Sequence, residues 1–77
     1  MTRLTLRDPR QTLSDLQWTA TLHCAPDARR VLTDEAQTLA AKIDAATRPG
    51  ASAADVHAAY DAAAEARRVM RLWRGAR

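Results

Sequence analysis

Arginine side chains near the end of the sequence are the residues whose type and spacing most readily suggest chemistry. Five of them fall within residues 67–77, where no acidic residue occurs: Arg67, Arg68, Arg71, Arg74 and Arg77. Positions 67, 71 and 74 share one face of a helix, and their guanidinium groups could bind phosphates through paired hydrogen bonds. Cations at the end of a helix also interact favourably with its dipole, which gives the pattern an ordinary structural explanation. Nucleic-acid binding through these arginines is therefore an alternative function.

A cluster of large apolar side chains overlaps the arginines and suggests a different kind of contact. It consists of Val69, Met70, Leu72 and Trp73. These residues cannot all face one side of a helix, because successive residues are turned by about 100°. We therefore expect part of the cluster to contact the N-terminal segment, a second copy of the chain or a different protein. Trp, Met and Arg are enriched in protein–protein interfaces. The predicted partner-binding residues are Trp18, Arg67, Met70, Arg71, Leu72, Trp73 and Arg74.

Metal binding and catalysis have little support in the sequence. His23, Cys24 and His57 are the only soft metal ligands, and their spacing matches no zinc signature. Cys24 and His57 could form a catalytic dyad only if the fold brought them together. The sequence contains no glycine-rich phosphate loop, no His-Glu-x-x-His motif and no nucleophile elbow. We therefore expect no metal, no cofactor and no enzymatic activity.

The elements that position these residues are predicted by one turn and two apolar patterns. The turn lies at residues 48–52, where Pro49 ends one helix and Gly50 permits a left-handed backbone. Ser52 and Asp55 then form a capping box that begins the next helix. Residues spaced by three or four positions predict a helix over 52–74. They are Val56, Ala59, Ala63, Ala66, Met70 and Trp73.

A matching pattern precedes the turn and predicts a helix that begins at residue 26 or 33 and ends near 47. Its apolar residues are Leu32, Ala36, Leu39, Ile43 and Ala46. A short connection makes the two helices antiparallel neighbours. Folding the chain at the turn places Ile43 opposite Val56 and Leu39 opposite Ala59. A leucine that faces an alanine allows the two helices to approach closely.

Residues 1–25 are consistent with two structures. Ser14-Asp15-Leu16-Gln17 is a capping box, which predicts a helix from residue 15 to about 24. Apolar and polar residues also alternate over 16–23, which is typical of a strand and would pair with Leu4 and Leu6. We favour the helix, because the rest of the chain offers no sheet to join. In either structure Trp18 and Leu22 share one side and are expected to cover the two longer helices.

These patterns together predict a mainly α fold: an antiparallel, alanine-rich helical hairpin with a short N-terminal helix packed across it. The alternative is an α+β fold with a small β-hairpin at 2–24. The 77 residues form one small domain with a cover segment at 1–25, helices at 26–47 and 52–74, a turn at 48–51 and a tail at 75–77. The chain has a net charge of +3 and only two glycines. Alanine buries little apolar area, so the hairpin needs further cover.

The expected function is that of a small non-enzymatic protein-interaction module that acts as a homodimer. Its size and lack of catalytic motifs fit a modulator or inhibitor of the type encoded by phages or mobile elements, which binds a host protein. Acidic surfaces, including residues 33–66 of a second copy, would complement the arginines. One cysteine cannot form an internal disulfide, and no apolar run is long enough for a membrane span. We therefore expect a cytoplasmic protein without membrane contact.

Overall fold

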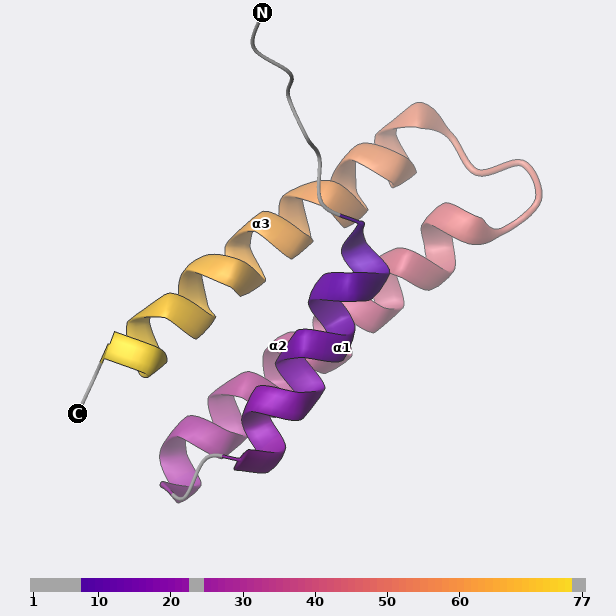
Figure 1. The fold of residues 1–77 in the computed structure, drawn as a ribbon. Coiled ribbons are helices and arrows are strands. Elements are labelled where there is room, and N and C mark those ends of the chain that lie inside the picture. Colours follow the sequence, from indigo (N-terminus) through magenta and orange to yellow (C-terminus); the bar gives the residue numbers. More distant parts are fainter. Residues whose placement is uncertain (1–7, 23–24, 76–77) are drawn as a thin grey trace, which may run out of the picture.

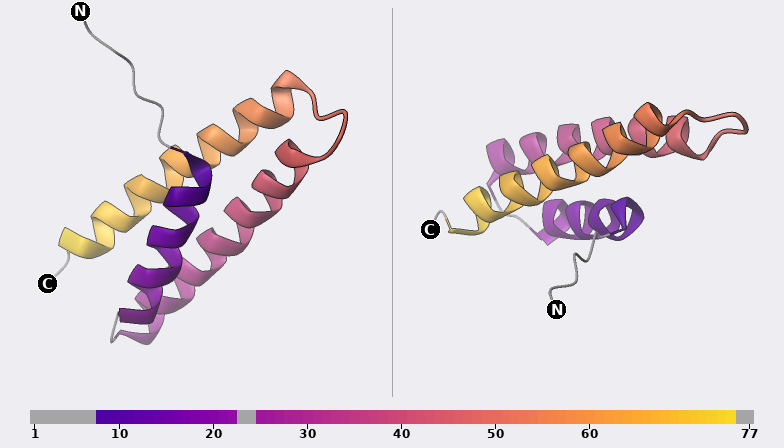
Figure 2. Two further views of the ribbon diagram at one scale, coloured as in Figure 1. Left: turned by 45° about the vertical axis from the view of Figure 1, so that its right-hand side comes forward. Right: turned by 90° about the horizontal axis from the view of Figure 1, so that it is seen from above.

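Three helices make up the computed structural model, which describes residues 8–22 and 25–75. They are α1 (Pro9–Leu22), α2 (Pro26–Thr47) and α3 (Ala53–Gly75), as Figure 1 shows. Helices α2 and α3 lie antiparallel in one layer, and α1 packs across one face of that layer (Figure 2). The described part of the chain contains no strand. The predicted mainly α hairpin is therefore confirmed, and the β-hairpin alternative is wrong for residues 9–22.

Helix α1 begins earlier than the capping box at Ser14 predicts. The backbone N–H of Arg10 donates to Asp8 Oδ1 at 2.9 Å, so Asp8 caps the helix. Pro9 occupies the first helical position, where a missing N–H has no cost. Ser14 therefore lies inside the helix, because Asp8 and Pro9 provide a complete start signal upstream.

The two ends of the hairpin turn follow the sequence prediction. Helix α2 begins at Pro26, the earlier of the two predicted starts, and ends at Thr47. Gly50 has a φ of 82°, in the left-handed region that glycine adopts without strain. The backbone N–H of Ser52 donates to Asp55 Oδ2 at 3.0 Å, and the N–H of Asp55 donates to Ser52 Oγ at 3.1 Å. This reciprocal capping box begins α3.

The core between α2 and α3 consists of leucines on one helix and alanines on the other. Leu32 and Leu39 of α2 are buried, as are Ala63 and Ala66 of α3. They belong to one cluster with Met70, which extends the same face of α3. Because alanine has only a methyl group, the leucines fill the space between two closely packed helices.

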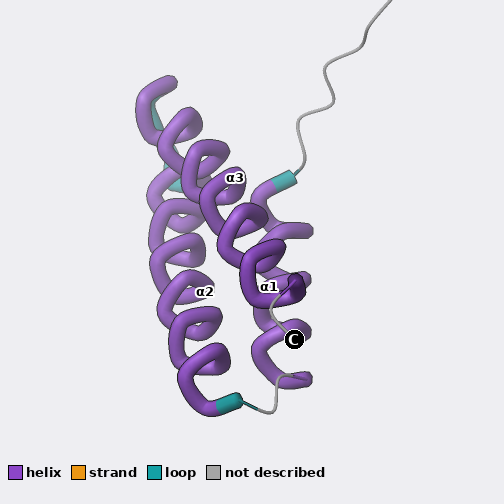
Figure 3. The backbone as a smooth tube through the Cα atoms, turned by 90° about the vertical axis from the view of Figure 1, so that its left-hand side faces the viewer, coloured by secondary structure: helices purple, strands orange, loops and turns teal. Residues whose placement is uncertain are grey.

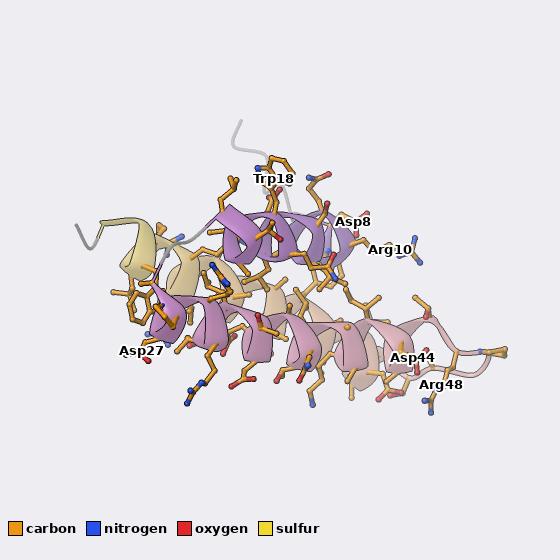
Figure 4. All side chains as sticks on the ribbon, turned by 90° about the horizontal axis from the view of Figure 1, so that it is seen from below. Asp8, Arg10, Trp18, Asp27, Asp44 and Arg48 are labelled. Carbon is orange, nitrogen blue, oxygen red and sulfur yellow. The ribbon has the colours of Figure 1, made fainter. Side chains whose placement is uncertain are left out.

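Helix α1 covers the hairpin with a different face from the one that the sequence predicts. Thr12, Leu16 and Ala20 are buried against α2 and α3, at spacings of four residues. Trp18 is 66% exposed and Leu22 is 61% exposed. Figure 4 shows Trp18 pointing away from α2 and α3. The expectation that Trp18 and Leu22 cover the hairpin is wrong, because small side chains at 12 and 20 let α1 lie close to an alanine-rich surface.

The cover provided by α1 ends before the turn. Helices α2 and α3 extend past α1 towards their connection (Figure 3). Ile43 is only half-buried there, and Val56 is 38% exposed. The expected pair of Ile43 and Val56 therefore lies at an end of the core that the described residues leave partly open.

Candidate functional site

The outer face of α1, which we define as Gln11, Ser14, Asp15, Trp18 and Leu22, is the most distinctive surface of the molecule. All five residues are exposed, and their spacing places them on the side of α1 opposite Leu16. Trp18 and Leu22 are one helical turn apart, so their side chains are neighbours. Asp15 lies one turn before Trp18 and accepts a hydrogen bond from Gln11 Nε2 at 3.3 Å. The face thus combines an apolar centre with one carboxylate and uncharged polar groups.

Exposure of Trp18 and Leu22 is notable because this chain has few large apolar side chains. The protein contains two tryptophans and no phenylalanine. Among the described residues, the large hydrophobic side chains left exposed are Trp18, Leu22, Val56 and Leu72. Single exposed apolar residues are ordinary, but neighbouring ones on one face often mark a contact surface.

The C-terminal part of α3 contributes less to the surface than its sequence suggests. Met70 is 4% exposed, and its Sδ accepts a hydrogen bond from Thr19 Oγ1 at 3.8 Å. Trp73 is half-buried and packs against the same core. Leu72 alone of the predicted α3 anchors is largely exposed, at 68%. Met70 is therefore part of the intramolecular core and Trp73 packs against it, while their role as partner-binding anchors stays a prediction.

The predicted arginine stripe is partly engaged within the chain. Arg67 donates from Nη1 to Thr12 Oγ1 at 3.1 Å, which links α3 to the buried face of α1. Arg68 forms an ion pair with Glu65 one turn earlier on α3. Arg71 is exposed. The backbone of Arg74 lies in the last turn of α3, and Arg77 lies outside the described residues.

A groove at the open end of the hairpin is a feature that the sequence analysis did not find. This tip groove has a volume of about 320 Å³ and lies between the end of α2 and the start of α3, beside the first turn of α1. Its lining is Asp8, Pro9, Arg10, Ile43, Ala46, Thr47, Val56, Ala59 and Tyr60. The apolar pattern of α2 and α3 predicts these walls. How far α1 covers these walls depends on where its first turn lies on the hairpin.

Of the residues that the structure describes, Arg10 is the one with a positive charge that lines the tip groove. Its guanidinium group has no hydrogen-bond or ion-pair partner among the described residues. In Figure 4 its side chain extends beyond the first turn of α1, towards the end of the hairpin that carries Arg48. The Asp8 carboxylate is engaged in capping α1. The described lining of the groove therefore combines apolar walls with one cation, at Arg10, and one carboxylate, at Asp8.

The structure gives little basis for a metal or catalytic site. No group of three His, Cys, Asp or Glu side chains in residues 8–22 and 25–73 is placed to hold a metal ion. His57 is exposed on α3, and His23 and Cys24 lie outside the described residues, so the possible dyad is not tested. Of the helices described, none is long and apolar enough to cross a membrane.

No family model matches the sequence, and no curated protein or solved structure matches it either. A functional assignment therefore depends on the surfaces of this chain, of which the outer face of α1 and the tip groove are the two most specific.

Proposed function

We propose that this chain is a non-enzymatic protein-interaction module that self-associates through the outer face of α1. The observation that carries the proposal is the exposure of Trp18, at 66%, in a fold that does not use it for its own core. Tryptophan is the residue type most enriched among the energetically dominant residues of interfaces. The contact that we propose is therefore centred on α1 and does not include Leu72 at the end of α3.

The composition of this face suits an interface. Trp18 and Leu22 form an apolar centre, and an aromatic side chain of this size buries about 150–250 Å² when it is fully enclosed. The surrounding Gln11, Ser14 and Thr21 are exposed and uncharged, and Asp15 adds one exposed carboxylate. The uncharged groups form a polar rim at little desolvation cost, and a carboxylate at the edge of an interface can remain in contact with water.

Sedimentation equilibrium over a range of protein concentrations tests the proposal. We expect the 8.5-kDa chain to sediment as a species of twice that mass at high concentration. Replacing both Trp18 and Leu22 by serine should yield the monomer, with an unchanged circular dichroism spectrum because both residues lie outside the core. Leu72→Ser is the matched control, since it removes an equally exposed apolar side chain elsewhere, and should leave the dimer intact. A native chain that stays monomeric up to millimolar concentration contradicts the proposal.

Nucleic-acid binding through the arginines has weaker support. Arg67 and Arg68 both have partners within the chain, at Thr12 and Glu65. We expect no shift of a mixed-sequence DNA or RNA oligonucleotide at micromolar protein and physiological salt. Binding at low salt that weakens steeply as salt is added would favour this alternative instead.

A further inference from the structure

The tip groove and the outer face of α1 both stay open within the part of the chain that the structure describes. The groove lies where α1 fails to cover the hairpin, and its walls include Ile43, Val56 and Tyr60, none of which is fully buried. Ala46, which carries only a methyl group, also lines it. A volume of about 320 Å³ is sufficient for a large side chain. The groove could therefore receive a large apolar group.

Trp18 of a second copy has the chemistry that this groove requires. It is the largest exposed apolar side chain among the described residues. Asp15 lies one turn before it on the same face of α1, so any surface that receives Trp18 also meets a carboxylate. Arg10, at the rim of the groove, offers a guanidinium group that has no partner among residues 8–22 and 25–75. The charge of Arg10 is thus opposite to that of Asp15, whereas the Asp8 carboxylate of the same rim is held at the start of α1 by its capping hydrogen bond.

We propose that Trp18 of each copy inserts into the tip groove of the other, with Asp15 of one copy facing Arg10 of its partner. This inference deepens the self-association proposed above and depends on it. A two-fold axis makes such an exchange reciprocal, because the same two surfaces meet twice. One contact then covers both the tip groove and the outer face of α1.

The shape of the molecule allows this arrangement. Helix α1 stands above the layer of α2 and α3, and that layer continues past it towards the turn (Figures 2 and 3). The end of the hairpin that α1 does not cover therefore forms a lower surface beside the first turn of α1. When two copies face each other in opposite directions, α1 of each copy can lie against this lower surface of the other. Trp18, which points away from its own hairpin in Figure 4, then points towards the hairpin of the partner.

Filling the groove from within is the first test. Ala46→Leu places additional carbon atoms in the groove and keeps a strong helix former in α2. We expect the dimer dissociation constant, measured by sedimentation equilibrium, to rise at least about thirtyfold, as for loss of an interface hot spot. The matched control is Ala41→Leu, which adds the same side chain at an exposed position of α2 that does not line the groove. The control should leave the dissociation constant within about twofold of the native value.

Exchange of charges is the second test and does not depend on packing in the groove. Arg10→Glu and Asp15→Arg should each weaken the dimer by about threefold or more, because each places like charges at the rim. The two substitutions combined restore opposite charges and should recover most of the native affinity. Both positions are exposed, so neither substitution removes a core contact.

The outcomes separate this inference from the function on which it depends. A native dimer that Ala46→Leu does not weaken, or whose two charge variants show no mutual rescue, overturns the exchange of Trp18 and leaves self-association standing. A native chain that is monomeric at every concentration overturns both. A weakened dimer for Ala46→Leu, a native-like control and rescue in the double charge variant together support the exchange.

Discussion

Two residues of α1, separated by a single position, have opposite roles. Leu16 is fully buried between α1 and the hairpin, whereas Trp18 is 66% exposed. Their angular separation of about 200° on a helix makes this unavoidable, because only one of them can face the hairpin. The smaller side chain occupies the core because the opposing surface is largely alanine. The larger one stays exposed, and in the dimer that we propose it contacts the second copy.

The burial of Leu16 and the exposure of Trp18 predict that truncating the smaller side chain lowers the free energy of unfolding more than truncating the larger one. Leu16→Ala should lower the free energy of unfolding by about 2–5 kcal/mol, as do comparable truncations of buried leucine. Trp18→Ala should change it by less than about 0.5 kcal/mol in the monomer. Urea unfolding at a protein concentration below that of dimer formation measures both. A larger loss for Trp18→Ala would show that the indole group is part of the monomer core.

The hydrogen bond between Arg67 and Thr12 gives a second prediction at this scale. Thr12 is 1% exposed, and its hydroxyl accepts from the guanidinium group at 3.1 Å. Thr12→Ala should destabilise the fold by about 1–3 kcal/mol, because it removes an acceptor from a charged donor. Thr21→Ala is the control, since the Thr21 hydroxyl bonds only to its own helix at an exposed position. Equal effects of the two substitutions in urea unfolding would contradict a bracing role for Thr12.

At the scale of the elements, the hairpin turn is the segment whose sequence and structure agree most closely. Pro49, Gly50 and the pair of Ser52 and Asp55 act through local backbone geometry, and local geometry is readable from neighbouring residues. The φ of 82° at Gly50 and the reciprocal capping hydrogen bonds follow directly from these residue types.

Gly50→Ala isolates the backbone contribution of this turn. A Cβ atom at this position would meet nothing within 4 Å, so any cost arises from the left-handed conformation alone. We expect a loss of about 1–2 kcal/mol in the free energy of unfolding. A thermal or urea unfolding curve that matches the native protein would indicate that the turn adopts another conformation. Ala51→Gly, in the adjacent turn position, is the comparison for a general change in flexibility.

Helix α1 shows what the sequence pattern could not predict. The amphipathic pattern of α2 and α3 follows from regular spacing on two long helices, and the buried residues match it. Over residues 16–22 of α1, apolar residues alternate and do not single out one face. The choice of Thr12, Leu16 and Ala20 over Trp18 and Leu22 depends on the shape of the hairpin surface, which is a tertiary property. The tip groove escaped prediction for the same reason, since its walls come from all three helices and depend on how they pack.

The whole molecule is a thin body of two helical layers. The Cα atoms extend over 40 × 34 × 15 Å, and the shortest dimension is that of one helix stacked on two. A body of this shape has a high ratio of surface to volume and a small core. Association of two copies through α1 and the tip groove would place both grooves between the hairpins. Apolar surface that a single copy leaves in water would then contribute to stability.

Coupling between association and folding predicts a melting temperature that depends on protein concentration. The melting temperature of the native chain should rise as its concentration increases, because dimer formation stabilises only the folded state. The variant with serine at 18 and 22 should melt at one temperature throughout. Thermal denaturation followed by circular dichroism over a hundredfold range of concentration makes the comparison. Concentration-dependent melting of the variant would place the interface away from α1.

The contact between Trp18 and the partner's groove can be observed directly with a mixed dimer. One copy is labelled with ¹³C and ¹⁵N and the other is unlabelled, and isotope-filtered nuclear Overhauser spectra report only contacts between copies. We predict cross-peaks from the Trp18 indole protons to the methyl groups of Ile43 and Val56 across the interface. A dimer of the expected mass whose filtered spectrum lacks these cross-peaks would contradict the account.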